Sequence, residues 1–336
     1  MQEEQARQHL EEVRSIHNEM RGYKHDFHHH LQALKGQLEA GQVDRAIAYL
    51  EQLDRSLQTV DTLLKTGNVT VDAILSAKLA QARAAGIDVT MAQYPYTAGS
   101  TFLHVVIPPW YHSRGVDGLL RALREERGAI KHDLDTRMDW ENFSQSVGWE
   151  KIFVSSVVSE ANQPCVGKSI SQIAAERGHA DPADAAFDLL VEEQLAVGMI
   201  SFGLDEADIT AIMRHPAVSF ITDGLMSGRP HPRAYATYPR ILGRYVREQG
   251  VLSLEEAVRK MTSLPARKIR LRNKGVIAEG YDADLVVFDP DTVIDKNSYD
   301  DPRVHPAGIA HVLVNGVFVV EDAALTGARP GRVIRD

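Results

Sequence analysis

The stretch from Ser219 to Glu248 decides the fold class, and it reads SFITDGLMSGRPHPRAYATYPRILGRYVRE. An apolar run, VSFIT, begins at Val218 and is followed by Asp223 and Gly224. This pattern predicts a buried strand followed by a turn. From Pro239 onward, apolar residues recur at helical spacing. A strand followed by a helix is the repeating unit of α/β folds, and a carboxylate just past a buried strand is where barrel enzymes keep catalytic groups.

The same alternation of β-rich and helical patterns extends in both directions from this stretch, starting at residue 88. Four runs predict strands: DVTMAQYPY (88–96), KIFVSSVV (151–158), AVGMISFG (196–203) and VSFITDG (218–224). Four further runs predict helices: 115–126, 184–194, 239–249 and 254–263. Alternation of this kind predicts βα units and a parallel sheet. Two later runs, ADLVVFDP (283–290) and HVLVNGVFVV (311–320), predict strands of a separate β layer.

Bulk properties restrict the function classes. The chain has 336 residues, 44% hydrophobic and 25% charged, which fits about two globular domains. A net charge of −9 argues against a nucleic-acid partner. The single cysteine, Cys165, excludes an internal disulfide and is expected to be a small buried residue. We expect a cytoplasmic protein without a membrane partner, because no apolar run reaches the ~20 residues of a spanning helix and the charged N-terminus lacks a signal peptide.

The first 65 residues have a different sequence pattern, because they contain almost no helix-breaking residues. Apolar residues recur at three- and four-residue steps over 10–38 and again over 47–64, with Gly41 between the two stripes. This pattern predicts an antiparallel helical hairpin, and a third helical pattern covers 71–82. Because two stripes make a thin core, we expect a homodimer that forms a four-helix bundle.

The first predicted helix carries the sequence KHDFHHH, in which Phe27 lies on the apolar stripe and His25 lies about 200° away, facing solvent. With the following residues, it resembles the dimerisation and phosphotransfer hairpin of sensor histidine kinases, whose hallmark is a His-Asp pair followed by an aromatic residue. The resemblance implies that His25 is the phospho-acceptor and that residues 1–87 form the helical part. His29 stands where such kinases carry Asn, and no glycine-rich nucleotide box follows, so autophosphorylation is not expected.

Two other interpretations of these histidines stay open. His25 with His29, and Asp26 with His30, are i,i+4 pairs that could hold a metal ion on one helix face. Alternatively, the cluster is a solvated polar face without a ligand.

Several motifs of the remaining chain occur together in order: QYPYTAGST (93–101), the stretch 218–248, the stretch 252–295, and the closing run 308–335. Together they resemble the N-acyl-D-amino-acid deacylases, or D-aminoacylases, of the amidohydrolase superfamily. The resemblance implies an α/β fold with a partial (β/α) barrel over 88–275 and strands of an incomplete small β-sandwich over 276–336. It also implies a zinc site at the barrel mouth and an N-acyl-D-amino acid as substrate.

The resemblance assigns roles to a few residues. Asp223 matches the carboxylate that acts as general base; as an alternative, it is only a strand-ending Asp in a turn with Gly224. His231 and Arg233 match the HPR loop and are candidates for shaping the substrate loop. By contrast, Asp282 and Asp284 in GYDADLVVFDP are expected to serve a turn and not a metal.

The metal ligands of the family have no clear match, so the metal site is unknown from the sequence. No His-x-His pair precedes a β run, Ala92 stands where the family has Asp, and Tyr94 stands near where some members place a histidine ligand. Catalytic zinc sites use about three protein ligands. We therefore expect that this chain alone does not hold zinc and is inactive as a hydrolase.

Overall fold

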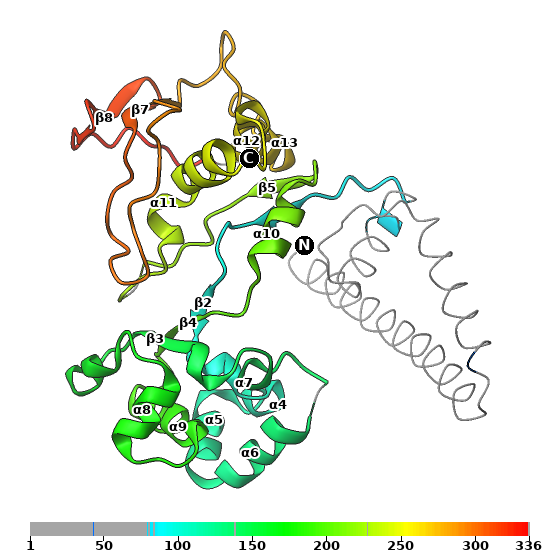
Figure 1. Cartoon of the computed structure of the whole chain (residues 1–336), viewed down its shortest axis with the longest axis vertical. Coiled ribbons are helices and arrows are strands. Elements are labelled where there is room, and N and C mark those ends of the chain that lie inside the picture. The colour runs from blue at the N-terminus through cyan, green and yellow to red at the C-terminus, as the bar shows by residue number, and fades with distance from the viewer. Residues whose placement is uncertain are drawn as a thin grey trace, which may run out of the picture. The chain divides into compact units, whose positions relative to one another are not determined.

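The structure is a computed structural model that describes Val43, Leu79 and residues 81–82, 85–137, 139–226 and 228–334. It divides into two compact units, one of residues 1–63 and 70–81 and one of residues 64–69 and 82–336. The predicted hairpin, the third helical pattern up to residue 78, and the histidines at 25 to 30 lie outside the described residues. Apart from Val43, Leu79 and Gln81, the described residues belong to the second unit (Figure 1).

This unit is mixed helix and sheet. Its strands are β1 (Met91–Gln93), β2 (Gly99–Phe102), β3 (Ile152–Ser156), β4 (Gly198–Ser201), β5 (Val218–Phe220), β6 (Leu285–Phe288), β7 (Ile309–Val314), β8 (Val317–Glu321) and β9 (Ala324–Leu325). Its α-helices are α4 (Pro109–His112), α5 (Gly115–Glu125), α6 (Arg127–Thr136), α7 (Phe143–Ser146), α8 (Ile170–Arg177), α9 (Pro182–Glu192), α10 (Glu206–Met213), α11 (Arg233–Arg240), α12 (Leu254–Met261) and α13 (Ser263–Lys268). Short 3-10 segments are η1 (Leu103–Val106), η2 (Trp149–Lys151) and η3 (Glu160–Cys165), and η4 (Ile241–Glu248) is a π-helix.

Among the strands that the structure describes, only one pair is parallel. β1 lies beside β5, with Met91 opposite Val218 and Gln93 opposite Phe220. The other sheets, in the orders β2-β4-β3 and β6-β7-β8-β9, are antiparallel. The α/β composition and every strand predicted from the sequence are confirmed. The expectation of a parallel sheet is wrong for β3 and β4, which pair antiparallel with each other.

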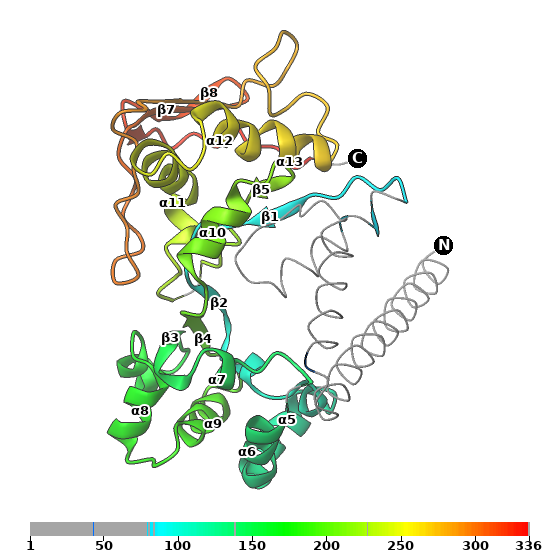
Figure 2. The same cartoon turned by 45° about the vertical axis from the view of Figure 1, so that its right-hand side comes forward.

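The reason for this difference is that the segment between β1 and β5 has its own core. This core contains buried residues from Leu103 to Met199, contributed by the segments from η1 to β4. Figures 1 and 2 show α4–α9 gathered beside β2, β3 and β4. A second core runs from Ile209 to Val293 and also contacts Met91 of β1. Apolar patterning predicts that a strand is buried, but it leaves the partner strand and the direction of pairing open.

The helix after β5 departs from regular geometry. α11 contains Pro239 and a non-helical residue, Ala236, with φ −141°. The chain then continues as the π-helix η4, whose buried residues include Ile241 and Tyr245. Proline removes a backbone donor and crowds the preceding turn, which explains why the backbone is irregular around it. The irregular helix brings Arg233 and Arg240 toward the carboxyl end of β1.

Candidate active site at the ends of β1 and β5

Asp223 lies where the sequence placed it, just beyond the buried strand β5. Because β1 and β5 are parallel neighbours, their carboxyl ends lie at the same edge, so Asp223 and Tyr94 follow adjacent strand ends. Asp223 adopts a left-handed backbone conformation, with φ 47°, and its side chain is 58% exposed. A residue other than glycine in this conformation is uncommon and is often found at functional positions.

The partner of Asp223 is the buried guanidinium of Arg233. Nη2 of Arg233 lies 2.9 Å from Oδ2 of Asp223 and also donates to the backbone oxygen of Ser100 at 3.1 Å. The guanidinium stacks 4.4 Å from the ring centroid of Tyr94. Arg233 is only 1% exposed, and its Nε and Nη1 have no hydrogen-bond partner among the described residues. Both atoms are themselves buried, so the guanidinium serves here to hold Asp223 and the Tyr94 ring in place.

His231 holds this arrangement in place. Its Nδ1 accepts from the backbone N–H of Arg233 at 3.0 Å, so its Nε2 carries the proton that it donates to the oxygen of Ala98 at 2.9 Å. The rings of Tyr96 and Tyr299 pack edge-on at 5.0 and 5.1 Å. With both nitrogens engaged, this imidazole links the loop after β5 to the segment after β1 and is not available as a metal ligand.

Burial, assisted by the charge of Arg233, lowers the pKa of His231 from 6.5 to about 3. The folded protein therefore keeps this imidazole neutral at pH values where the unfolded chain protonates it. The contribution of His231 to the free energy of unfolding is fully present above about pH 6.5 and is lost as the pH falls toward 3. Each pH unit costs up to about 1.4 kcal/mol. We expect urea unfolding between pH 7 and 5 to show this loss in the wild type and a smaller one in His231→Gln. His132→Gln, at an exposed position, is the control. Identical pH dependence in all three proteins would contradict this assignment.

Comparison with known proteins identifies both parts of the chain. Residues 165–320 match the model of the amidohydrolase family, and residues 5–66 match the α-helical domain of SpoOB-type sensor kinases. The chain is 38% identical to N-acyl-D-glutamate deacylase of Alcaligenes xylosoxydans xylosoxydans over 77% of its own length and 44% of that protein. It is 43% identical to D-aminoacylase of the same organism over 50% of its own length and 34% of that protein. The chain thus carries a match to a SpoOB-type helical domain followed by a match to the amidohydrolase family, as expected of a fusion.

Solved structures agree with this identification. N-acyl-D-glutamate deacylase from Bordetella bronchiseptica, in complex with zinc and a phosphonate inhibitor, is similar with a TM-score of 0.60 and 33% identity, over 80% of this chain and 47% of that one. A D-aminoacylase mutant in complex with CuCl2 gives a TM-score of 0.58 and 34% identity, over 78% of this chain and 46% of that one. The chain thus spans less than half the length of these metal-bound amidohydrolases.

Among the described residues, no group of three or more His, Cys, Asp or Glu side chains could hold a metal ion. Asp282 and Asp284, which the sequence assigned to a turn, both pair with Lys274, and Asp284 also accepts from the backbone N–H of Asn315.

None of the helices in the described part has the length and apolar content that crossing a bilayer requires.

Sequence reasoning missed an ion pair that supports the site of the amidohydrolase domain. Arg240 donates through Nε to the oxygen of Pro95 at 2.9 Å, lies 2.8 Å from Asp295, and stacks 4.7 Å from the ring centroid of Tyr96. This pair fixes the segment after β1 against α11. Asp295 lies about 55 residues from Arg240 in the sequence, so no local pattern connects the two.

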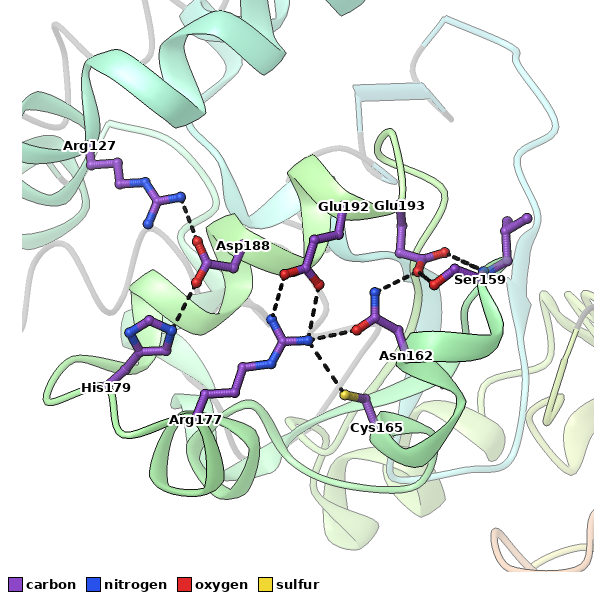
Figure 3. Close-up of polar contacts among 10 residues, drawn as sticks. Arg127, Ser159, Asn162, Cys165, Arg177, His179, Asp188, Glu192 and Glu193 are labelled. Carbon is purple, nitrogen blue, oxygen red and sulfur yellow. Dashed lines mark hydrogen bonds and ion pairs between the residues drawn. The ribbon is translucent and has the colours of Figure 1, made fainter.

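A second polar cluster of this domain, between β3 and α9, was also missed (Figure 3). The buried carboxylate of Glu193 accepts from the backbone N–H groups of Val158 and Ser159, from the Ser159 hydroxyl and from Nδ2 of Asn162. Nη2 of Arg177 lies 2.7 Å from Oδ1 of Asn162. Because every group in this cluster has a partner within it, we assign it to stability. Cys165, beside it, is buried, as the sequence predicted.

Proposed function

We propose that the amidohydrolase domain contains the part of an N-acyl-D-amino-acid deacylase site that holds the general base, and that Asp223 is this base. The observation that carries this proposal is the pairing of the Asp223 carboxylate with the buried Arg233 at the edge where β1 and β5 end. In this role, Asp223 takes a proton from the water that attacks the amide carbonyl and passes it to the leaving amine. Its exposed carboxylate is reachable by both groups.

The substrate class comes from the relatives and not from the geometry of Arg233. The chain resembles N-acyl-D-glutamate deacylase and D-aminoacylase. Arg233 instead orients the base: its Nη2 pairs with Asp223, the Tyr94 ring packs 4.4 Å from the guanidinium, and His231 accepts from the backbone N–H of Arg233. The two remaining donors, Nε and Nη1, are buried and share no edge on which a carboxylate could make two parallel hydrogen bonds.

We further propose that the chain alone does not hydrolyse such substrates. A carboxylate base works on a water whose pKa is near 15.7 unless another group lowers it. The described residues contain no donor set that could hold a zinc ion beside Asp223. Because the described residues offer no such donor set, we do not expect this chain by itself to carry out the zinc chemistry of the metal-bound relatives.

The test is a hydrolysis assay on the purified full chain with added zinc. We expect no free D-methionine from N-acetyl-D-methionine, and no free D-glutamate from N-acetyl-D-glutamate, above a no-protein background. Asp223→Asn is the matched variant, since it keeps the side-chain shape and removes the base. Release of D-amino acid by the wild type that disappears in Asp223→Asn would contradict the inactivity and would support Asp223 as the base.

A second candidate function belongs to the helical domain, because residues 5–66 match a sensor-kinase helical domain. We propose that this domain dimerises and that His25 accepts a phosphoryl group from a kinase supplied in trans. Incubation with the ATP domain of a related kinase and labelled ATP should label the chain. His25→Gln should abolish the label and His29→Gln should keep it; equal loss in both variants would favour the metal-pair interpretation instead.

A further inference from the structure

A surface pocket of about 400 Å³ lies on the part of the domain that has its own core. Three segments contribute to its walls: residues within 102–104 at the end of β2 and in η1, residues within 112–119 of α4 and α5, and residues 194–196 between α9 and β4. Pockets that bind small molecules commonly enclose about 300 to 1,000 Å³. None of the described lining residues belongs to the candidate active site, so the pocket is a separate feature of the fold.

The pocket lining lacks permanently charged side chains. It contains aromatic, aliphatic and amide side chains and two imidazoles, and none of its described residues is Asp, Glu, Lys or Arg. Burial, with a smaller effect of the neighbouring His112, lowers the pKa of His104 below its ordinary value of 6.5, so this imidazole is neutral at pH 7. An ion in the pocket would lose water without meeting an opposite charge, which is costly. The lining therefore favours an uncharged ligand.

His112 presents a hydrogen-bond acceptor. Its Nε2 lies 3.0 Å from the backbone oxygen of His104 and 3.2 Å from that of Ile107. Both oxygens can only accept, so Nε2 carries the proton and Nδ1 of the neutral ring has a free lone pair. Among the described residues, neither Nδ1 of His112 nor Nδ1 of His104 has a hydrogen-bond partner, but only that of His104 is buried. A ligand with an N–H or O–H group can therefore donate to Nδ1 of His112.

An aromatic wall lies beside this acceptor. The rings of Phe102 and His104 are parallel to within 6°, with centroids 5.8 Å apart, and the His104 ring centroid lies 5.4 Å from that of His112. Phe102 is 44% exposed, and Val116 on α5 is 61% exposed. Aromatic faces bind planar rings by offset stacking, and the burial of such exposed apolar surface is favourable. The wall is therefore suited to a planar aromatic ligand.

A further wall carries side chains at positions where glycine is usual. Gln194 and Leu195 follow α9, and both adopt left-handed backbone conformations, with φ 50° and 70°. The backbone N–H of Leu195 donates to the oxygen of Leu190 and so closes the end of the helix. Glycine is the ordinary residue in this conformation, because it has no Cβ to strain the backbone. Both positions instead carry side chains that line the pocket, and strained residues of this kind cluster at ligand sites.

We infer that this pocket is a binding site for an uncharged, planar aromatic molecule that carries an N–H or O–H donor. The ring of the ligand stacks on the wall formed by Phe102 and His104, and Val116 covers it from α5. Its donor bonds to Nδ1 of His112. The inference is independent of the proposed deacylase function, because no residue of the Asp223 site takes part.

Isothermal titration calorimetry of the purified full chain with indole tests this site. Indole is uncharged and planar and has one N–H donor, benzofuran has nearly the same shape without the donor, and indole carboxylate carries a negative charge. We expect saturable binding of indole to one site per chain. Benzofuran should bind at least about threefold more weakly because it lacks the hydrogen bond, and indole carboxylate at least about tenfold more weakly because its charge is not compensated.

Two pocket variants and two matched controls locate the site. Phe102→Ala removes the stacking face, and Val116→Trp fills the pocket from an exposed position that does not disturb the core. Each should weaken indole binding by at least about tenfold. Phe318→Ala, at a residue 38% exposed on β8, and Val276→Trp, at a residue 56% exposed after α13, lie outside the lining and should bind indole like the wild type.

Each outcome decides the inference. Binding of indole that both pocket variants weaken and both controls keep supports it. No saturable binding of indole up to about 5 mM, or equal weakening by the controls, would overturn the site. Equal affinity for indole and benzofuran, or tighter binding of indole carboxylate than of indole, would overturn the assigned class of ligand.

Discussion

Glu193→Ala should lower the free energy of unfolding by about 3 kcal/mol. The carboxylate of Glu193 is 4% exposed and holds the Val158–Asn162 segment through four hydrogen bonds. Removing it leaves buried backbone and side-chain donors without partners, each of which costs on the order of 1–3 kcal/mol. Chemical denaturation at pH 7 measures the difference.

The neighbouring residue provides the matched control. Glu192 pairs with Arg177 at 3.0 Å, but its side chain is 44% exposed, so Glu192→Ala should cost less than about 1 kcal/mol. Equal effects of the two substitutions would show that the Glu193 cluster does not stabilise the fold in the way described.

Acidification should also reduce the contribution of Glu193 to the stability of the fold. Burial alone would raise the pKa of Glu193, but the hydrogen bonds from Ser159 and Asn162 outweigh it and lower the pKa from 4.5 to about 2. The stabilisation is therefore complete above about pH 4.5 and is lost as the pH falls from there toward 2. Glu193→Ala should be less sensitive to acid than the wild type over this interval.

Local patterns predicted the secondary structure well, and their failures have a common physical cause. The apolar runs at 88–96, 151–158, 196–203 and 218–224 all contain strands, because burial is encoded in the run itself. β2, with the sequence GSTF, was missed because glycine and serine weaken the strand signal. Its strand structure comes from pairing with β4, a contact about 100 residues away.

Local patterns predicted only part of the site, because they report burial along a run and not contacts between distant segments. Asp223 was found because it directly follows a buried strand. The sequence named Arg233 only as a loop candidate, and the ion pair to Asp223 becomes visible only when α11 packs beside β1. Arg240, Asp295 and Tyr299 were missed because Arg240 lies in α11 and the other two lie in a loop about 55 residues later, so they meet only through tertiary packing.

The proposed function accounts for several features of the amidohydrolase domain. The domain has a positioned carboxylate, a buried guanidinium paired with it and a four-stranded antiparallel sheet near its C-terminus. A single carboxylate paired with a cation is a poor zinc ligand set, because zinc sites need about three donors converging on one point. Under the proposed function, Asp223 would be the base, and the group that activates water would not be held by the described residues alone.

Zinc content of the purified full chain tests this central claim most directly. The chain is saturated with zinc, dialysed against metal-free buffer, and measured by elemental mass spectrometry beside Asp223→Asn. We predict fewer than about one retained zinc ion per chain, with the same value in both proteins, because Asp223 lacks partner ligands. Retention of one zinc ion per wild-type chain that Asp223→Asn loses would contradict this account and would show that the chain builds the metal site by itself.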